Sequence, residues 1–134
     1  MSTRCNIHFK NSYTDVNIYR HSDGYPDGKS GVISDLHTFF NEVRRQCKGS
    51  IYGTRFDDPS YLAAKFIVWQ AGENGEYAQD YSLTTAQQEA SAKANPLNFG
   101  SLGVADKDAS DGEYVYVVDC DTMDADKFPT VTFR

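Results

Sequence analysis

Hydrophobic and polar residues alternate near the start of the chain in the way that is typical of a β-hairpin. Apolar side chains occupy every second position over most of residues 5–10 and 15–20. A two-residue turn at Ser12-Tyr13 would place Ile7 opposite Ile18 and gather the apolar side chains on one face. The turn contains neither Asn-Gly nor Asp-Gly, so a longer loop is the alternative.

The same register assigns a set of polar side chains to the other face of the hairpin. They are Arg4, Asn6, His8, Asn17, Tyr19 and His21. Arg4 would lie roughly opposite His21, and cross-strand neighbours of this kind are about 5 Å apart at Cβ. Two interpretations of this face stay open: it forms the floor of a pocket, or it is the solvent-facing side of an edge hairpin.

Two further stretches predict helices. Residues 32–47 carry apolar side chains at helical spacing, with Ser30 as a candidate N-cap and Lys48-Gly49 as the end. A second helix begins at Asp57-Asp58-Pro59 and ends at Gly72. Its expected inward residues are Leu62, Ala63, Phe66, Ile67 and either Trp69 or Gln70, although the run 66–69 leaves an extended end as an alternative.

The remaining pattern predicts smaller elements. Residues 76–83 read as a short strand or loop, and Thr84-Thr85 with Gln87-Gln88 predicts a capping box for a polar helix to Ala94. Short strands are expected at Leu102–Val104 and Glu113–Asp119, the latter central because both its faces are apolar, and a last strand at Phe128–Phe133. We therefore expect one α+β domain over residues 1–134, an antiparallel sheet of four to five strands with two main helices packed on one face.

Composition and charge exclude several classes. The 134 residues are 40% hydrophobic and 24% charged, as in ordinary globular proteins, and the sequence has no span that could cross a bilayer. Three widely spaced cysteines and an N-terminus without an apolar leader favour a cytoplasmic protein with reduced thiols. The net charge is −6, and residues 106–126 hold eight acidic residues against Lys107 alone. Direct nucleic-acid binding is therefore not expected.

Candidate chemistry concentrates in Tyr19–Gly28. Histidine is the side-chain type suited to proton transfer near neutral pH, so His21 is the candidate acid or base; Asp23 or Asp27 could orient it, Arg20 could hold an anionic substrate, and Tyr25 could act as a donor. These residue types suit metal-independent phosphoester or acyl hydrolysis, with His21, Asp23 and Arg20 as catalytic candidates. The competing interpretation is structural, because Asp, Gly and Pro are the residues that turns require. Arg4, Asn6, His8, Tyr19 and Tyr25 are the candidate ligand-binding residues around His21.

Metal and cofactor motifs are not evident in the sequence. His8, His21 and His37 form no His-x₃-His pair, and Asp106–Gly112 departs from the spacing of a calcium loop. We expect no metal and no cofactor. Nine tyrosines make an aromatic patch for a protein partner or a homodimer plausible.

Three segments resemble a group of small uncharacterised proteins of phages and other mobile DNA: Thr3–Ile7, Tyr19–Pro26 and Gly112–Asp119. Members pair an Arg-x-Asn-Ile start with a Tyr-Arg-His-Ser-Asp-Gly-Tyr-Pro turn and a late Gly-Asp/Glu-x-Tyr strand, whereas residues 50–105 do not match. The resemblance implies a mobile-element setting and no reaction. It implicates Arg4, Asn6, Arg20, His21, Asp23 and Tyr25 together. We expect an accessory protein that binds a protein or a small anionic ligand; the alternative is the hydrolase centred on His21.

Overall fold

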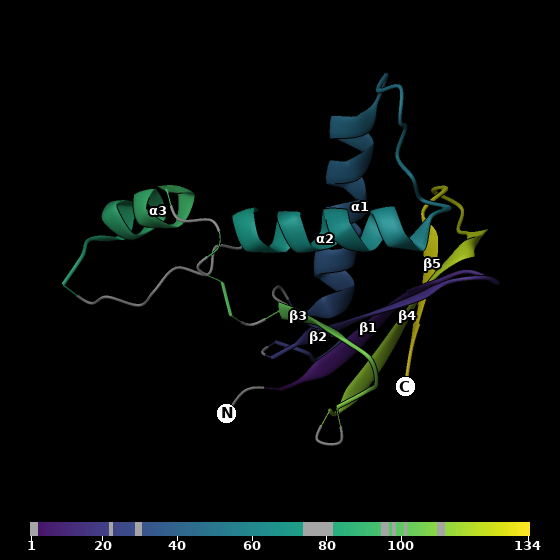
Figure 1. Ribbon diagram of the computed structural model, residues 1–134, viewed down its shortest axis with the longest axis horizontal. Coiled ribbons are helices and arrows are strands. Elements are labelled where there is room, and N and C mark those ends of the chain that lie inside the picture. The colour runs from purple at the N-terminus through teal and green to yellow at the C-terminus, as the bar shows by residue number, and fades with distance from the viewer. Residues whose placement is uncertain are drawn as a thin grey trace.

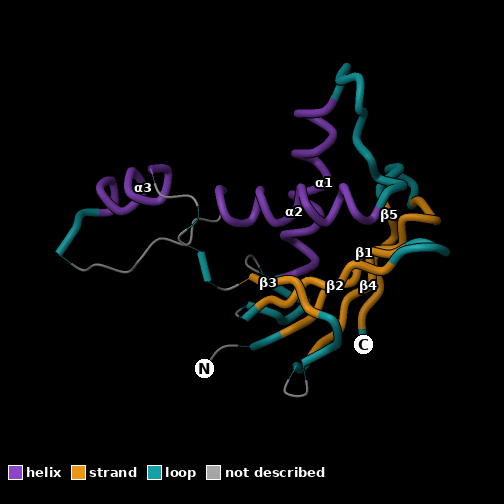
Figure 2. The backbone as a smooth tube through the Cα atoms, viewed as in Figure 1, coloured by secondary structure: helices purple, strands orange, loops and turns teal. Residues whose placement is uncertain are grey.

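The chain folds into a sheet layer and a helix layer, with one further helix standing apart (Figures 1 and 2). The computed structural model describes residues 3–21, 23–28, 31–73, 82–94, 97, 99–100, 102–109 and 112–134. Its elements are β1 (Cys5–Lys10), β2 (Asp15–Arg20), α1 (Val32–Cys47), α2 (Pro59–Glu73), α3 (Thr85–Ala94), β3 (Leu102–Ala105), β4 (Tyr114–Met123) and β5 (Pro129–Phe133). The predicted α+β class, with two main helices on one face of a five-stranded sheet, is confirmed.

The sheet has the order β3-β2-β1-β4-β5, and its central pair corrects one prediction. β1 and β4 run parallel, whereas the other pairs are antiparallel, so the expected purely antiparallel sheet is wrong. β3 and β4 point the same way and are separated by β2 and β1. The chain after β3 must therefore cross back over the face of the sheet that α1 and α2 leave open. We call its described part, residues 106–109, the crossover connection.

The register of the β1–β2 hairpin is the predicted one. Ile7 lies opposite Ile18, and Phe9 lies opposite Val16. The backbone N–H of Asn11 donates to the carbonyl of Thr14, so a two-residue turn closes the hairpin. The side-chain oxygen of Asn11 accepts hydrogen bonds from the backbone N–H groups of Tyr13 and Thr14, at 2.9 and 2.8 Å. These bonds stabilise the turn, which contains no glycine.

α1 has the predicted bounds and buries the predicted apolar stripe apart from Ile33, which is 36% exposed. Phe39 contacts Phe66 and Trp69 of α2 with ring centroids 5.2 and 5.6 Å apart, and Phe66 reaches Phe9 of the sheet at 5.5 Å. The N-cap is Gly31 and not the predicted Ser30, and a Cβ at position 31 would collide with the carbonyl oxygen of Asp27, so the position requires glycine. The candidate cap Ser30 lies outside the described residues.

α2 starts with the predicted cap, since Asp58 Oδ1 accepts from the backbone N–H of Ser60 at 3.1 Å. Leu62, Ala63, Phe66 and Trp69 are buried as expected. The helix runs through Gly72 to Glu73.

α3 confirms the predicted capping box. Thr84 Oγ1 accepts from the N–H of Gln87 at 3.2 Å, and the Gln87 side chain accepts from the N–H of Thr84 at 2.8 Å. In Figure 1 the helix stands away from α1 and α2. Most of the segment predicted as a strand or loop before it, residues 76–81, lies outside the described part of the chain.

β4 is an interior strand, as its two apolar faces predicted, and it extends beyond Asp119 to Met123 through an irregularity in its pairing with β5. Tyr116 and Val118 are buried toward the helices. β5 begins at Pro129 on the edge of the sheet, where the missing N–H costs no ladder hydrogen bond.

Candidate functional site

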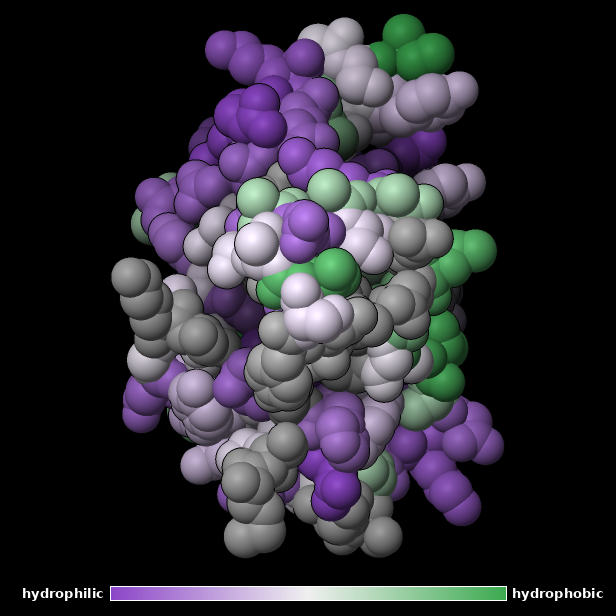
Figure 3. All heavy atoms as spheres, turned by 90° about the vertical axis from the view of Figure 1, so that its left-hand side faces the viewer, coloured by the Kyte–Doolittle hydropathy of each residue, from purple (hydrophilic) through white to green (hydrophobic). Residues whose placement is uncertain are grey.

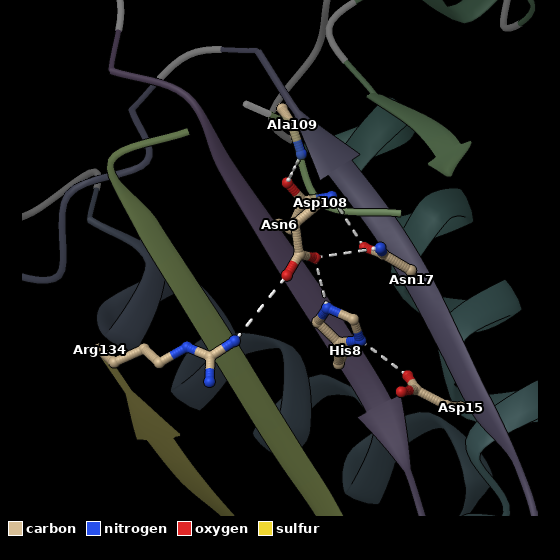
Figure 4. Close-up of polar contacts among 7 residues, drawn as sticks. All are labelled: Asn6, His8, Asp15, Asn17, Asp108, Ala109 and Arg134. Carbon is tan, nitrogen blue, oxygen red and sulfur yellow. Dashed lines mark hydrogen bonds and ion pairs between the residues drawn. The ribbon is translucent and has the colours of Figure 1, made fainter. Parts of the chain in front are cut away.

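The polar face of the hairpin is the docking surface for the crossover connection (Figure 4). Asn6 and Asn17 are buried, and Asn6 Nδ2 donates to Asn17 Oδ1 at 2.8 Å. Asn6 Oδ1 accepts from the backbone N–H of Ala109 at 2.9 Å, and Asn17 Nδ2 donates to Asp108 Oδ1 at 3.2 Å. The side-chain amides of Asn6 and Asn17 therefore hydrogen-bond to each other and to the crossover connection. This part of the face is covered by the chain itself, instead of forming the floor of a pocket or a solvent-facing surface.

His8 lies between two carboxylates on the same face. Its Nδ1 is 2.8 Å from Asp15 Oδ1, and its Nε2 is 2.6 Å from Asp108 Oδ1. Burial lowers the pKa of His8, but the hydrogen bonds and charges of Asp108 and Asp15 outweigh it and leave the pKa raised. Arg134 Nη2 lies 3.9 Å from the second oxygen of Asp108. With both ring nitrogens occupied, His8 offers no lone pair to a substrate or a metal.

His21 lies beside Arg4, as the register predicted. Arg4 Nε donates to His21 Nδ1 at 3.3 Å, and the Tyr19 hydroxyl lies 3.3 Å from the same nitrogen. Because Arg4 Nε can only donate, Nδ1 is the acceptor and Nε2 carries the proton of the neutral ring. The exposed nitrogen is then a hydrogen-bond donor, which suits recognition of an anion or a carbonyl better than proton abstraction.

The turn at Asp23–Gly28 is anchored to the start of β1 and to β4. Gly24 donates its N–H to the Thr3 carbonyl at 2.8 Å and accepts from the hydroxyl of buried Tyr116 at 2.7 Å. A Cβ at Gly24 would lie 2.8 Å from the Thr3 oxygen, so the close approach requires glycine. Asp23 has a positive φ of 53° and accepts from the Tyr25 hydroxyl at 3.3 Å, and the neighbouring carboxylate raises the pKa of Tyr25. These contacts support the turn interpretation.

Arg20 lies on the helix side of the sheet, away from the polar face. Its Nη1 forms an ion pair with Asp35 Oδ2 of α1 at 2.8 Å and donates to Gln70 Oε1 of α2 at 3.4 Å. Burial raises the pKa of Asp35, and the Arg20 guanidinium offsets part of that rise. The structure thus brings Arg4, Tyr19 and His21 together, but it does not bring Arg20 to them.

A groove of about 520 Å³ between α1 and α2 was not anticipated from the sequence. Val43 and Cys47 of α1 and Tyr61, Val68 and Trp69 of α2 contribute to its lining. Val68 is 74% and Tyr61 is 54% exposed, although both are large apolar side chains on an otherwise well-packed helix. The available signal was that apolar residues of α2 occupy more than one helical face.

An apolar loop extends the groove surface beyond α1. Ile51 and Tyr52 are 91% and 66% exposed, and a single hydrophobic residue stands out in green at the top of the molecule in Figure 3, among more hydrophilic ones. The Arg55 guanidinium lies 4.6 Å from the ring centroid of Tyr61 and 5.9 Å from that of Tyr52. Arg55 therefore connects the loop to the outer face of α2.

Metal and membrane classes find no support in the part of the chain that the structure covers. Its described residues contain no cluster of three or more His, Cys, Asp or Glu side chains that could hold a metal ion. Likewise, none of the described helices has the length and apolar character needed to cross a membrane.

Comparison with known proteins does not identify a function for this chain. No family model, curated protein or solved structure matches the chain. The resemblance to proteins of mobile DNA stays a prediction.

Proposed function

We propose that this chain is a binding protein that holds an apolar segment of a partner protein in the groove between α1 and α2. The observation that carries the proposal is the exposure of Val68 and Tyr61 on the rim of that groove. A small ligand inside the groove would leave the rim and the Ile51-Tyr52 loop in water. A protein segment covers both, and burying a Val or Tyr side chain contributes roughly 1.5–3 kcal/mol.

The charge of segment 42–65, whose residues Glu42 and Lys65 line the groove, favours a partner with acidic residues beside its apolar ones. Residues 42–65 hold five basic side chains, Arg44, Arg45, Lys48, Arg55 and Lys65, against the three acids Glu42, Asp57 and Asp58. This local excess of positive charge contrasts with the net charge of −6 of the whole chain. Complementary charge accelerates association and rejects partners of like charge.

The setting we propose is that of an accessory protein of mobile DNA in the cytoplasm. The resemblance at Tyr19–Pro26 supports an origin in mobile DNA. The free thiols of Cys5, Cys47 and Cys120 support a reducing compartment.

Hydrolysis centred on His21 is the less favoured function. The predicted reaction needs His21 as a base with a free lone pair and Arg20 as the cation that holds an anionic substrate. The Nδ1 atom of His21 already accepts from Arg4, and the guanidinium of Arg20 is paired with Asp35 on the helix side.

Site-specific photo-crosslinking in cells that express the protein tests the proposal. A photoreactive residue at position 68 should capture a partner, whereas one at position 104 should not. Val104 is a matched control, because it is also 74% exposed but lies on β3. The partner, once purified, should bind wild type and Val104→Asp equally and bind Val68→Asp at least about tenfold more weakly, which corresponds to about 1.4 kcal/mol.

Two outcomes would overturn the proposal. One is equal capture from positions 68 and 104; the other is equal binding of the partner to wild type and Val68→Asp. Thermal unfolding of both variants controls for folding. Because both valines are largely exposed, neither substitution should shift the midpoint appreciably.

A further inference from the structure

We propose that the crossover connection is held on the sheet by a doubly hydrogen-bonded imidazolium at His8, so that deprotonation of this ring loosens the connection. The proposal is independent of the groove. It rests on the arrangement of His8 between Asp15 of β2 and Asp108 of the connection, which Figure 4 shows from the open side of the sheet.

The geometry requires a proton on each ring nitrogen. A carboxylate can only accept, and a neutral imidazole has a single N–H. With contacts of 2.8 Å at Nδ1 and 2.6 Å at Nε2, a neutral ring would set one lone pair against a carboxylate oxygen. The His8 side chain is 17% exposed, so water has little room to relieve that repulsion.

The charges around the ring favour the same state. The groups facing it come from every neighbouring strand and from the connection: Asp15 and Asn17 on β2, Asn6 and Lys10 on β1, Val117 and Asp119 on β4, Asp108, and Arg134 after β5. Among the described residues, Asp15 and Asp108 hydrogen-bond to the ring. Arg134, whose side chain is 80% exposed, forms an ion pair with Asp108 at 3.9 Å.

Loss of the proton would weaken the connection without releasing it. A neutral ring keeps either its Nε2–H bond to Asp108 or its Nδ1–H bond to Asp15, so the bridge that His8 forms between these two carboxylates is broken in both cases. The bonds from Asn17 to Asp108 and from Ala109 to Asn6 remain.

The direction of the pH effect follows from the raised pKa of His8. Its stabilising contribution is complete below the unfolded-state pKa, about 6.5. It is lost as the pH rises through the higher folded-state pKa.

Nuclear magnetic resonance on the full chain tests the proposal. Long-range ¹H–¹⁵N spectra between pH 5 and 9 should show His8 protonated on both nitrogens, with a pKa above 6.5. Amide exchange of Ala109, corrected for intrinsic pH dependence, should accelerate several-fold through that transition. The control amide is that of Ser60, which donates to Asp58 Oδ1 at 3.1 Å at the start of α2.

Variants separate the ring's charge from its size. His8→Gln should reduce Ala109 protection at pH 6 and abolish its pH dependence, whereas His21→Gln should change neither. Asp15→Asn keeps the ring and should lower the His8 pKa, and it serves if His8→Gln does not fold. The proposal is overturned if the His8 pKa is 6.5 or lower, or if Ala109 protection is the same in His8→Gln and wild type.

Discussion

Replacing Arg20 with Met tests whether this arginine is a structural group or one available to a ligand. The ion pair between Arg20 and Asp35 is 2.8 Å long, and the two side chains are only 6% and 13% exposed. Removing the guanidinium leaves the Asp35 carboxylate buried without its cation. Breaking a buried pair in this way costs about 3–5 kcal/mol, and we expect a loss of that size at pH 7.

The deficit should shrink in acid. Burial already raises the pKa of Asp35, and loss of the Arg20 charge would raise it further. Because protonation removes the unpaired charge from the folded state, the variant gains more stability than wild type as the pH falls through the Asp35 pKa. The difference between the two proteins is therefore larger at pH 7 than at low pH.

Urea unfolding followed by circular dichroism measures both effects. Arg45→Met is the matched control, because Arg45 and Glu42 form a pair of similar length, 2.7 Å, on the exposed face of α1. We expect its unfolding midpoint to equal that of wild type. The double variant Arg20→Met/Asp35→Leu should recover most of the lost stability, since it removes both buried charges. A loss below about 1 kcal/mol for Arg20→Met, the value of an exposed pair, would refute the reasoning.

Three further substitutions probe other contacts. Tyr116→Phe removes the hydrogen bond to the Gly24 carbonyl and should cost about 1–3 kcal/mol in urea unfolding, because a buried acceptor is left unsatisfied; an unchanged midpoint would contradict this. Asn17→Ala leaves the Asn6 amide without its partner and should cost a similar amount, about 1–3 kcal/mol, while accelerating amide exchange of Ala109. Thr84→Ala removes half of the α3 capping box and should reduce helical circular dichroism with no change in the cooperative unfolding midpoint; a shifted midpoint would show that α3 contributes to the core.

Elements set by local patterning could be predicted from the sequence. The alternation of residues 5–20 determines the pairing of Ile7 with Ile18, because a slip of one residue would turn every apolar side chain to the other face. The bounds of α1 follow from its apolar stripe, and the start of α2 follows from Asp58 and Pro59. The neighbourhood of Arg4 and His21 also followed from the register.

The register of the hairpin implied that Arg20 faces the helices, but the sequence interpretation did not reach this conclusion. Val16, Ile18 and Arg20 share one parity along β2, so a register that turns the first two toward the helices also turns the third toward them. The chemical content of the Tyr19–Gly28 segment suggested an active site, and this grouped Arg20 with His21 although adjacent strand residues face opposite sides. Residue proximity along the chain was a poorer guide than strand periodicity.

Other features depend on contacts between distant parts of the chain. Whether β4 runs parallel or antiparallel to β1 is determined by the path of the crossover connection, and no local pattern in either strand records that path. The sequence offered for Asp108 only the calcium-loop comparison over Asp106–Gly112, which fails on spacing, yet Asp108 contacts His8 and Asn17. The groove could not be predicted without knowing how α1 and α2 cross. Val68 and Tyr61 line it because no other part of the described chain covers them, and their positions in the sequence do not show this.

The central position of β1 has a consequence for the order in which the protein can fold. β1 can pair with β2 as soon as the hairpin is synthesised, but its other edge must wait for β4, whose Tyr114 pairs with Cys5 across more than a hundred positions. Closing so long a loop raises the contact order and slows folding. Until β4 arrives, a nascent chain presents the unpaired edge of an apolar strand, the kind of template on which chains aggregate. The hairpin that best defines this fold is therefore also the part most in need of protection while the rest is being made.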